Sequence, residues 1–284
     1  MLTFDNKLEL SEHLKSVSST NPTVGFVPTM GALHEGHLSL LQESVDNNSL
    51  TVISIFVNPT QFNNPEDLEK YPRNLAIDIE KIKSVSDEII LFAPSVNDIY
   101  GDTTYNKTFQ FDGLDLPMEG SFRPGHYNGV ATIVSLLFEI VNPTNAYFGE
   151  KDFQQLQIIR KIVRKLRLKV NIIECPIFRE PNGLAMSSRN ARLTDKEKEI
   201  AGVIFAVLTK AKKIYDEPLA PLSKITAYVK KTFAKHKEIE LEYFEIVDEE
   251  TLISCERKSK FTKSRAFIVV YINNVRLIDT ISLN

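Results

Sequence analysis

The sequence predicts an α/β protein: a Rossmann-like parallel sheet with helices on both faces, followed by a smaller α+β C-terminal domain. Strand-like and helix-like segments alternate through the first 179 residues, a pattern typical of a parallel sheet. The segment Leu50–Val57 is β-branched and almost wholly apolar, as a strand buried on both faces would be. After Arg179 the alternation stops. We therefore expect two domains, residues 1–179 and residues 180–284, with the boundary in the loop Glu180–Gly183.

Apolar spacing defines the elements of the first domain. Leu38, Leu41 and Val45 recur at helical spacing and predict a helix after residue 37. The other predicted helices are Tyr71–Val85, Ala131–Val141 and Asp152–Leu166. The predicted strands are Thr23–Val27, Leu50–Val57, Glu88–Ala93, Asn145–Phe148 and Lys169–Cys175.

The second domain shows a different order of elements. Two helical segments come first, and they are Thr194–Tyr215 and Leu222–His236. Three strands follow, and they are Glu240–Val247, Ala266–Ile272 and Val275–Asp279. The pair Asn273-Asn274 between the last two strands predicts a tight hairpin turn.

Composition excludes several classes of protein. The chain is 43% hydrophobic and 25% charged, as soluble globular proteins are. Its net charge of −3 gives no reason to expect a nucleic-acid binder. We find no apolar run of the ~20 residues that span a bilayer, and no signal-peptide region in the first thirty residues. The two cysteines, Cys175 and Cys255, are isolated, so we expect free thiols and a cytoplasmic protein.

The stretch FVPTMGALHEGHLSL, Phe26–Leu40, is the most informative corner of the chain. A strand ends there, and a helix begins beside His34 and His37. Gly31 and Gly36 let a ligand approach the backbone, and helix N-termini favour anions. These features suggest a nucleotide phosphate site, although neither a Walker A loop nor a G-x-G-x-x-G fingerprint is present.

Two alternatives compete with the phosphate interpretation of this corner. His34-Glu35-Gly36-His37 superficially resembles the zinc motif H-E-x-x-H, but it is one residue too short. The histidines are also suited to capping and packing at a tight turn. The corner alone does not decide between capping and phosphate binding.

Three further polar clusters follow predicted strands or the domain boundary. Gly149-Glu150-Lys151-Asp152 offers a lysine for phosphate and a carboxylate for a ribose hydroxyl or Mg²⁺, or it is an ordinary helix start. Met186–Asn190, MSSRN, offers two hydroxyls and a guanidinium, or it is a polar surface loop. Asn58–Phe62, NPTQF, offers two amides that suit hydroxyl and carboxylate groups, or it is a polar loop.

Taken in order, these strings make the chain resemble the pantothenate synthetases, or pantoate–β-alanine ligases. That family belongs to the nucleotidyltransferase-type Rossmann proteins with an H-x-G-H signature, here His34–His37. The resemblance covers nearly the whole chain. The matching strings are VPTMGALHEGH (Val27–His37), SIFVNPTQF (Ser54–Phe62), YPR (Tyr71–Arg73), APSVNDIY (Ala93–Tyr100), EGSFRPGHYNGVATIV (Glu119–Val134), FGEKDFQQL (Phe148–Leu156), GLAMSSRN (Gly183–Asn190) and RLID (Arg276–Asp279).

The resemblance implies a ligase that uses ATP in two steps. ATP and pantoate give pantoyl adenylate and pyrophosphate, and the amine of β-alanine then attacks to give pantothenate and AMP. It also implies that residues 1–179 bind nucleotide and pantoate, while residues 180–284 form a lid. Mg²⁺ would arrive on the ATP phosphates, with Asp152 as a candidate ligand and no other metal ligand. A homodimer is expected, with no nucleic-acid or membrane partner.

The resemblance also assigns residue roles. His37 is the expected proton donor, with an imidazolium acting by its charge as the alternative. The expected catalytic residues are His34, His37, Lys151 and Arg189. The expected ATP-binding residues are Met30, Gly31, Ala32, Leu33, His34, Glu35, Gly36, His37, Gly149, Glu150, Lys151, Asp152, Phe178, Met186, Ser187, Ser188 and Arg189. Gln61, Gln155 and Asn58 are expected to bind pantoate or β-alanine.

Two rival functions remain open at this level. Another nucleotidyltransferase of the same fold would release a stable nucleotide product, but NPTQF together with GEKDFQQ argues against it. A non-catalytic nucleotide sensor would have no need for both histidines together with Lys151 and Arg189. Turnover of ATP separates the sensor from either enzyme.

Overall fold

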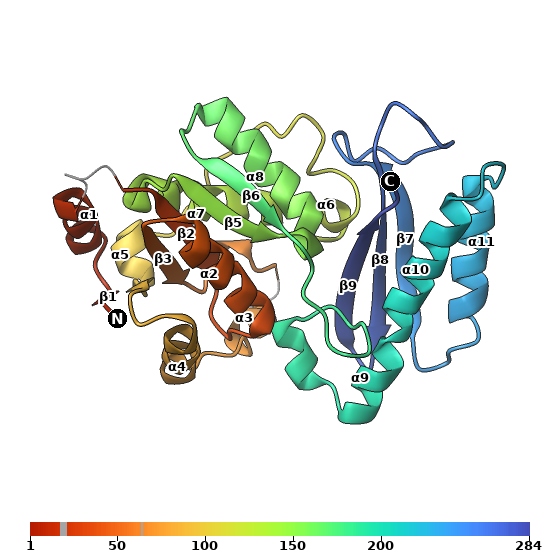
Figure 1. Ribbon diagram of the computed structural model, residues 1–284, viewed down its shortest axis with the longest axis horizontal. Coiled ribbons are helices and arrows are strands. Elements are labelled where there is room, and N and C mark those ends of the chain that lie inside the picture. The colour runs from red at the N-terminus through yellow and green to blue at the C-terminus, as the bar shows by residue number, and fades with distance from the viewer. Residues whose placement is uncertain (18–21, 64) are drawn as a thin grey trace. The chain divides into compact units, whose positions relative to one another are not determined.

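The computed structural model describes residues 1–17, 22–63 and 65–284 (Figure 1). These residues form two compact units. Unit 1 contains Met1–Gly149 and Gln154–Pro176, and unit 2 contains Glu150–Phe153 and Ile177–Asn284. Within the described residues, no helix has both the length and the apolar content to cross a bilayer.

Unit 1 is built on a six-stranded parallel sheet with the order β1-β4-β3-β2-β5-β6. This sheet and the α+β unit after it confirm the predicted fold class. Five of its strands were predicted, but β1 was not. The strands are β1 (Thr3–Phe4), β2 (Val24–Thr29), β3 (Leu50–Ile55), β4 (Ile90–Phe92), β5 (Asn145–Gly149) and β6 (Asn171–Cys175).

Helices lie on both faces of this sheet. Successive residues of a strand point to opposite faces, so the contacts of two neighbouring residues of β2 show both layers. The ring of Phe26 in β2 lies 6.2 Å from the ring of Phe138 in α7. The next residue, Val27, belongs to the apolar cluster that contains Leu40 and Leu41 of α2. The helical elements of this part are α1 (Lys7–Val17), α2 (Glu35–Asn47), η2 (Pro59–Gln61), α3 (Pro65–Glu69), α4 (Leu75–Val85), α5 (Val96–Tyr100), α6 (Glu119–Phe122), α7 (His126–Val141) and α8 (Phe153–Leu166).

Two helices of unit 1 begin away from their predicted starts, for local reasons. The helix expected from residue 71 begins at Leu75, because the Asn74 side chain accepts a hydrogen bond from Ile77 N and caps it. The helix expected from residue 131 begins five residues earlier, at His126. Gly129 in its second turn weakens the sequence pattern. It is needed there because a Cβ would lie 2.5 Å from the carbonyl oxygen of Thr60.

Unit 2 contains an antiparallel sheet of three strands in the order β7-β8-β9. The sequence predicted all three strands. Asn273 and Asn274 both have positive φ, 45° and 63°, as the predicted two-residue hairpin turn requires. The elements of unit 2 are η3 (Glu150–Asp152), η4 (Ser188–Arg192), α9 (Asp195–Ala201), α10 (Val203–Tyr215), α11 (Leu222–Phe233), β7 (Glu240–Asp248), β8 (Ser264–Ile272) and β9 (Val275–Ser282).

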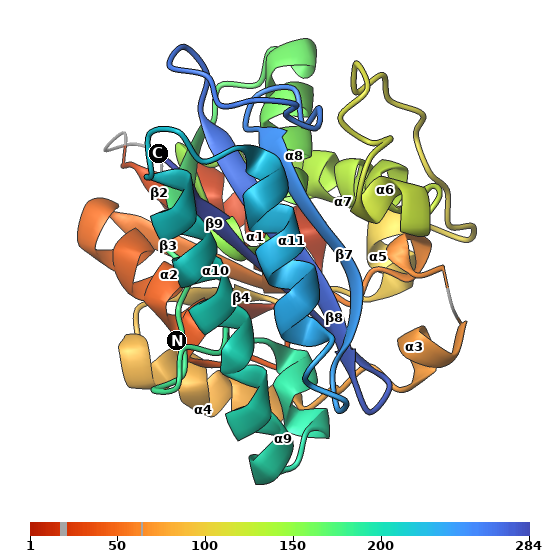
Figure 2. The same cartoon turned by 90° about the vertical axis from the view of Figure 1, so that its right-hand side faces the viewer.

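The first predicted helix of the second domain is two helices. Gly202 ends α9 and begins α10, and a Cβ there would lie 2.9 Å from the carbonyl oxygen of Asn182. The chain therefore bends where a neighbouring segment comes close. Helices α10 and α11 lie side by side over one face of the small sheet (Figure 2).

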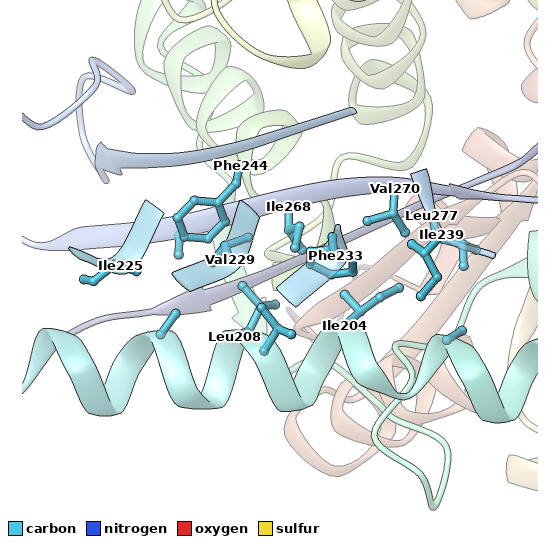
Figure 3. Packing of buried hydrophobic residues seen from close by; sticks show 14 of the residues in the cluster. Ile204, Leu208, Ile225, Val229, Phe233, Ile239, Phe244, Ile268, Val270 and Leu277 are labelled. Atoms are coloured by element: carbon cyan, nitrogen blue, oxygen red, sulfur yellow. The ribbon is translucent and has the colours of Figure 1, made fainter. Parts of the chain in front are cut away.

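The core of unit 2 is formed between these two helices and the sheet (Figure 3). Ile204 and Leu208 of α10 and Val229 of α11 face Ile268 and Val270 of β8. Because strand side chains alternate, the neighbouring residues Arg265 and Phe267 of β8 lie on the opposite face. That second face becomes important for the functional site.

Candidate functional site

The histidine corner lies at the point where the strand order of unit 1 reverses. The chain visits β3 and β4 on one side of β2, and β5 and β6 on the other. In open α/β sheets, ligands bind beyond the carboxyl ends of the strands at such a switch point. The loop after β2 leads to His34, the residue immediately before α2. The predicted helix N-terminus near the two histidines is confirmed, although α2 begins at Glu35 and not after residue 37.

Both histidine rings cap α2 through the same ring atom. The Nδ1 of His34 accepts from Gly36 N at 3.1 Å, and the Nδ1 of His37 accepts from His34 N at 3.3 Å. An accepting ring nitrogen carries no proton, so in a neutral ring the proton lies on Nε2. The geometry therefore assigns each ring the tautomer in which Nε2–H is a donor. Capping and phosphate binding are compatible, since they use different nitrogens.

The two rings also lie against each other. Their centroids are 4.0 Å apart and their planes are tilted by 31°. Two imidazolium ions at this separation would repel by about 4 kcal/mol at an effective dielectric constant of ~20. Protonated Nδ1 atoms would also face backbone N–H groups. The arrangement therefore favours neutral rings as hydrogen-bond donors over a pair of charges.

A buried carboxylate holds the loop that precedes the histidines. Asp78 of α4, 3% exposed, accepts from Ala32 N at 2.9 Å and from Leu33 N at 2.8 Å. Ala32 has a φ of 51° and Gly31 one of 78°, so the loop follows a path that few residues tolerate without support. Lys81, one turn further along α4, donates to the carbonyl oxygen of Leu33. The sequence interpretation missed this brace.

The predicted NPTQF cluster meets the histidine loop inside unit 1. It follows β3, which pairs with β2 in parallel. The amide nitrogen of Gln61 lies 2.7 Å from the sulfur of Met30. Gln61 and Met30, predicted to bind different substrates, are therefore neighbours at the same edge of the sheet.

Asn58 contacts the side chain of Gln61 and is itself held by other protein groups. Its side chain, in a residue only 1% exposed, accepts from the Tyr100 hydroxyl at 2.7 Å and from Thr60 Oγ1 at 3.2 Å. Its amide nitrogen donates to Gln61 Oε1 and to Gly129 O, both at 3.3 Å. The amide is thus occupied by protein partners. Burial raises the pKa of the Tyr100 hydroxyl, which keeps that group protonated as a donor.

The backbone of Gln61 is also held by hydrogen bonds. Its carbonyl oxygen lies 2.9 Å from Nδ1 of His126 and accepts from Arg123 at 3.4 Å. Both residues lie in or beside the Gly- and Pro-rich stretch EGSFRPGHY. The start of that stretch is held by Gln154, whose Oε1 accepts from Glu119 N at 3.1 Å. The amide nitrogen of Gln154 donates to the segment just before it, to Leu114 O at 2.9 Å and Pro117 O at 2.8 Å. Gln154 therefore supports the fold. Its neighbour Gln155, which is expected to bind pantoate or β-alanine, is partly exposed at the start of α8.

The Glu150–Asp152 segment forms a single 3₁₀ turn and belongs to unit 2. The side chain of Lys151 is 17% exposed, and its Nζ lies 3.5 Å from Oδ2 of Asp152. Asp152 is half exposed, with 50% of its side chain accessible. The predicted lysine and carboxylate thus lie side by side. Gly149 is the last residue of β5 and belongs to unit 1.

A second part of unit 2 contains the MSSRN string. Arg179 and Ala185 form an antiparallel bridge, and Met186 N donates to Phe178 O at 3.0 Å. Phe178 and Met186, both predicted beside adenine, are therefore adjacent at the open end of a small hairpin. Ser187 caps η4, and its Oγ accepts from Arg189 N at 3.3 Å.

An ion pair between Arg179 and the buried carboxylate of Asp279 anchors this hairpin to β9. Arg179 donates to both carboxylate oxygens of Asp279, at 2.7 and 3.0 Å, and to Gly183 O at 3.0 Å. The guanidinium carbon also lies 3.8 Å from the ring centroid of Phe205. Burial raises the pKa of the Asp279 carboxyl, while Arg179 and the more distant Lys151 oppose that rise. Asp279 is part of the RLID string, and its role was not predicted.

The predicted site residues divide between the two units. Unit 1 contains Met30, Gly31, Ala32, Leu33, His34, Glu35, Gly36, His37, Asn58, Gln61, Gly149 and Gln155. Unit 2 contains Glu150, Lys151, Asp152, Phe178, Met186, Ser187, Ser188 and Arg189. Among the described residues, no three His, Cys, Asp or Glu side chains gather into a group that could hold a metal ion.

Fold and corner together define the class of protein. A parallel Rossmann-like sheet with an H-x-G-H string at the helix start beside the switch point is the nucleotide-binding arrangement of the nucleotidyltransferase type. The family within that class follows from comparison. The chain matches the model of the pantoate–β-alanine ligase family over residues 2–282, and it belongs to that family.

Individual relatives agree with this assignment. The chain is 56% identical to the pantothenate synthetase of Flavobacterium psychrophilum, with 100% of both chains covered. It is 49% identical to that of Christiangramia forsetii, again over 100% of both. Members of this family are ligases, and so is this chain.

Solved structures give the same answer. Pantothenate synthetase from Thermus thermophilus has a TM-score of 0.90 and 34% identity, covering 100% of this chain and 99% of that one. The pantoate–β-alanine ligase from Francisella tularensis, complexed with β-γ ATP and β-alanine, has a TM-score of 0.80 and 36% identity, covering 100% and 98%.

Proposed function

We propose that this chain condenses pantoate with β-alanine, using ATP, through a pantoyl adenylate intermediate. Products are pantothenate, AMP and pyrophosphate. Family membership supports the overall reaction. The arrangement of His34 and His37 carries the mechanistic part, since each ring has its Nδ1 occupied by a backbone N–H and its Nε2–H as the donor.

In the first step, a carboxylate oxygen of pantoate attacks the α-phosphorus of ATP. The bond from that phosphorus to the bridging oxygen breaks, and pyrophosphate leaves. Negative charge grows on the α-phosphate oxygens and on pyrophosphate. Two Nε2–H donors at a helix N-terminus would hydrogen-bond to those oxygens in a fixed direction. Neutral donors orient the phosphates without a net positive charge.

The cations of unit 2 would balance the charge that the histidines do not. Lys151 and Arg189 are proposed to contact the transferring phosphates, together with the hydroxyls of Ser187 and Ser188. Ser187 can donate its hydroxyl hydrogen while its oxygen accepts from Arg189 N. Phe178 and Met186 would lie against the adenine, and Gly149 with Asp152 against the ribose.

In the second step, the amine of β-alanine attacks the acyl carbon of the adenylate. The C–N bond forms, the acyl–oxygen bond breaks, and AMP leaves with its charge stabilised by the same phosphate donors. Gln61 and Gln155 are proposed to hold pantoate, with Gln61 also near β-alanine. Asn58, whose amide is occupied by protein groups, is proposed to act by fixing the Gln61 side chain.

Mg²⁺ would enter on the ATP phosphates and reduce their charge. Asp152 supplies an accessible carboxylate oxygen of the kind Mg²⁺ prefers, so the residues present fit such an ion. The division into a binding domain, residues 1–179, and a lid, residues 180–284, stays a prediction. The homodimer and the cytoplasmic location also stay predictions.

Product analysis tests this function directly. The protein is mixed with Mg²⁺-ATP, pantoate and β-alanine, and each component is omitted in turn. We expect AMP and pyrophosphate in step with pantothenate, and an ATP–pyrophosphate exchange that requires pantoate alone. ADP and phosphate would mean an acyl-phosphate route and would overturn the adenylate. No ATP consumption by the folded protein would favour a nucleotide sensor.

A further inference from the structure

Lys151 lies in a turn that is attached to unit 2 at both of its ends. The turn leaves β5 at Gly149, and unit 1 resumes at Gln154. Only the four residues Glu150–Phe153 between them belong to unit 2. So short an excursion needs specific contacts to hold it, because only Phe153 of its four residues is buried. Those contacts converge on Arg265.

Arg265 contacts the residue at each end of the turn. Its Nη1 donates to Oε2 of Glu150 at 3.2 Å. Its guanidinium carbon lies 3.8 Å from the ring centroid of Phe153, and that ring also meets Phe267 at 6.1 Å with an angle of 60°. Arg265 and Phe267 lie two residues apart on the same face of β8. The turn is therefore fixed to the face of the sheet that α10 and α11 do not cover.

The charges show that Arg265 is not itself the group for an anion. Its side chain is only 4% exposed, and a second acid, Glu249, accepts from its Nε at 3.0 Å. Two carboxylates thus surround one guanidinium. A buried, planar and fully engaged arginine of this kind orients its neighbours. The cation of the turn that remains partly accessible is Lys151.

The geometry points to Arg265 and Glu150 as positioning residues for Lys151. Residues 150 and 153 are held, and residue 151 lies between them in the chain, so the Lys151 backbone has a fixed position relative to the small sheet. This inference rests on the proposed function, in which Lys151 contacts the transferring phosphate. Catalytic rate depends on such placement, because an error of 1 Å can cost about 100-fold.

The decisive experiment is a double-mutant cycle between Glu150→Gln and Lys151→Ala. Glu150→Gln removes the charged acceptor on the turn and leaves the pair between Arg265 and Glu249 intact. We expect it to lower the kcat of adenylate formation about 10-fold, with KM for β-alanine unchanged. In the Lys151→Ala background the same change should lower kcat less than about 2-fold, because a residue that acts through the lysine has nothing left to position.

Glu242→Gln is the matched control. Glu242 accepts from Arg276 Nε at 2.9 Å and from the Tyr271 hydroxyl at 3.1 Å, across the same three strands. The Glu242→Gln variant therefore weakens an acid–arginine pair of the same sheet and leaves the turn Glu150–Phe153 unchanged. We expect its kcat to stay within about 2-fold of wild type. Amide hydrogen exchange supplies a readout besides activity, and Glu150→Gln should speed exchange in peptides covering residues 150–152 only.

The outcomes separate the inference from the function beneath it. Equal losses from Glu150→Gln in both backgrounds would overturn positioning, because the effects would be independent. Unchanged kcat and exchange in Glu150→Gln would overturn it as well. Wild-type kcat in Lys151→Ala would remove the proposed role of the lysine and the inference with it, while pantothenate and AMP would still establish the ligation.

Discussion

The histidine corner of unit 1 and the cationic segments of unit 2 are built on different physical principles. At the corner, a carboxylate of α4 binds two backbone N–H groups, and the histidines satisfy two more through Nδ1. In unit 2, both segments are anchored by arginine–carboxylate contacts with one buried member, Asp279 with Arg179 and Arg265 with Glu150. One region fixes a backbone path, and the other fixes charges.

The difference suggests a division of labour on a polyphosphate. In the proposed mechanism, the neutral histidine donors set where the phosphate oxygens lie, and their hydrogen bonds depend little on the local charge. Lysine and arginine balance charge but have long flexible stems, so they need anchors near their backbone. Variants of the corner should therefore lower kcat with modest losses of stability. Variants of the buried pairs should lower stability first.

Replacing His37 with Ala should have the largest effect on catalysis. It removes the Nε2–H donor that we propose for the phosphate, and a single such donor is worth about 10²–10³-fold in kcat. It also removes the cap on His34 N, at a cost of about 1 kcal/mol. Quenched adenylate assays and thermal unfolding measure the two effects.

His37→Gln separates the two roles of His37. Glutamine at the third helical position can still accept from the backbone N–H of the capping residue. We expect near wild-type stability and the same loss of kcat as in His37→Ala. A glutamine variant with near-normal turnover would show that His37 is only a cap. The histidine corner would then no longer differ from unit 2 in supplying neutral phosphate donors.

Asp78→Asn should have the next largest effect on rate. One of the two carboxylate oxygens becomes an amide NH2 group, which donates and so cannot accept from the backbone N–H it faces. A buried donor then loses its partner at a cost of about 1–3 kcal/mol. The displaced loop should lower kcat about 10–100-fold. Steady-state kinetics and urea unfolding test this, with Glu80→Gln on the exposed face of the same helix as the control. Equal kcat in both variants would mean that catalysis does not depend on the hydrogen bonds from Ala32 N and Leu33 N to Asp78.

Asp279→Asn should affect stability more than rate. It leaves the Arg179 guanidinium, whose side chain is 17% exposed, half paired beside a buried amide, and breaking a pair with one buried member costs up to about 3 kcal/mol. The control is Glu66→Gln, which breaks the exposed pair with Lys70 and should cost less than about 0.5 kcal/mol. Denaturant unfolding followed by probes in each unit measures both. A change confined to kcat, with unfolding unaltered, would contradict the anchoring role.

Ser187→Ala should have the smallest effect of the four. The hydroxyl caps a short 3₁₀ helix and supplies one neutral donor among several groups. We expect a loss of about 1 kcal/mol in transition-state stabilisation, close to 5-fold in kcat/KM for ATP. Ser187→Thr keeps the hydroxyl and should retain activity. A loss beyond 100-fold in the alanine variant would place this serine among the catalytic donors and blur the comparison.

The sequence by itself determined the fold class and the start of the site. Apolar periodicity is a local signal, so it located five strands of the parallel sheet, the antiparallel strands of unit 2 and the hairpin at Asn273-Asn274. His34 and His37 were recognisable because a strand end, two glycines and a helix start are contiguous in the chain. The sequence missed α1, although Leu10 and Leu14 are buried at helical spacing. It also joined α9 to α10, because nothing local reveals what lies against Gly202.

Only the tertiary structure decided which residues support the chemistry. Asp78 is 45 residues from Leu33, and Arg265 is 115 residues from Glu150, so no window of sequence joins them. A lone acid or arginine in an amphipathic helix or strand looks like a solvated charge until folding shows what it contacts. Once such a residue is found to be buried, a supporting role follows, because a buried charge is stable only with partners that hold it in place. The same reason explains why only the folded chain shows that the Asn58 amide contacts protein groups and that the turn of Lys151 belongs to unit 2.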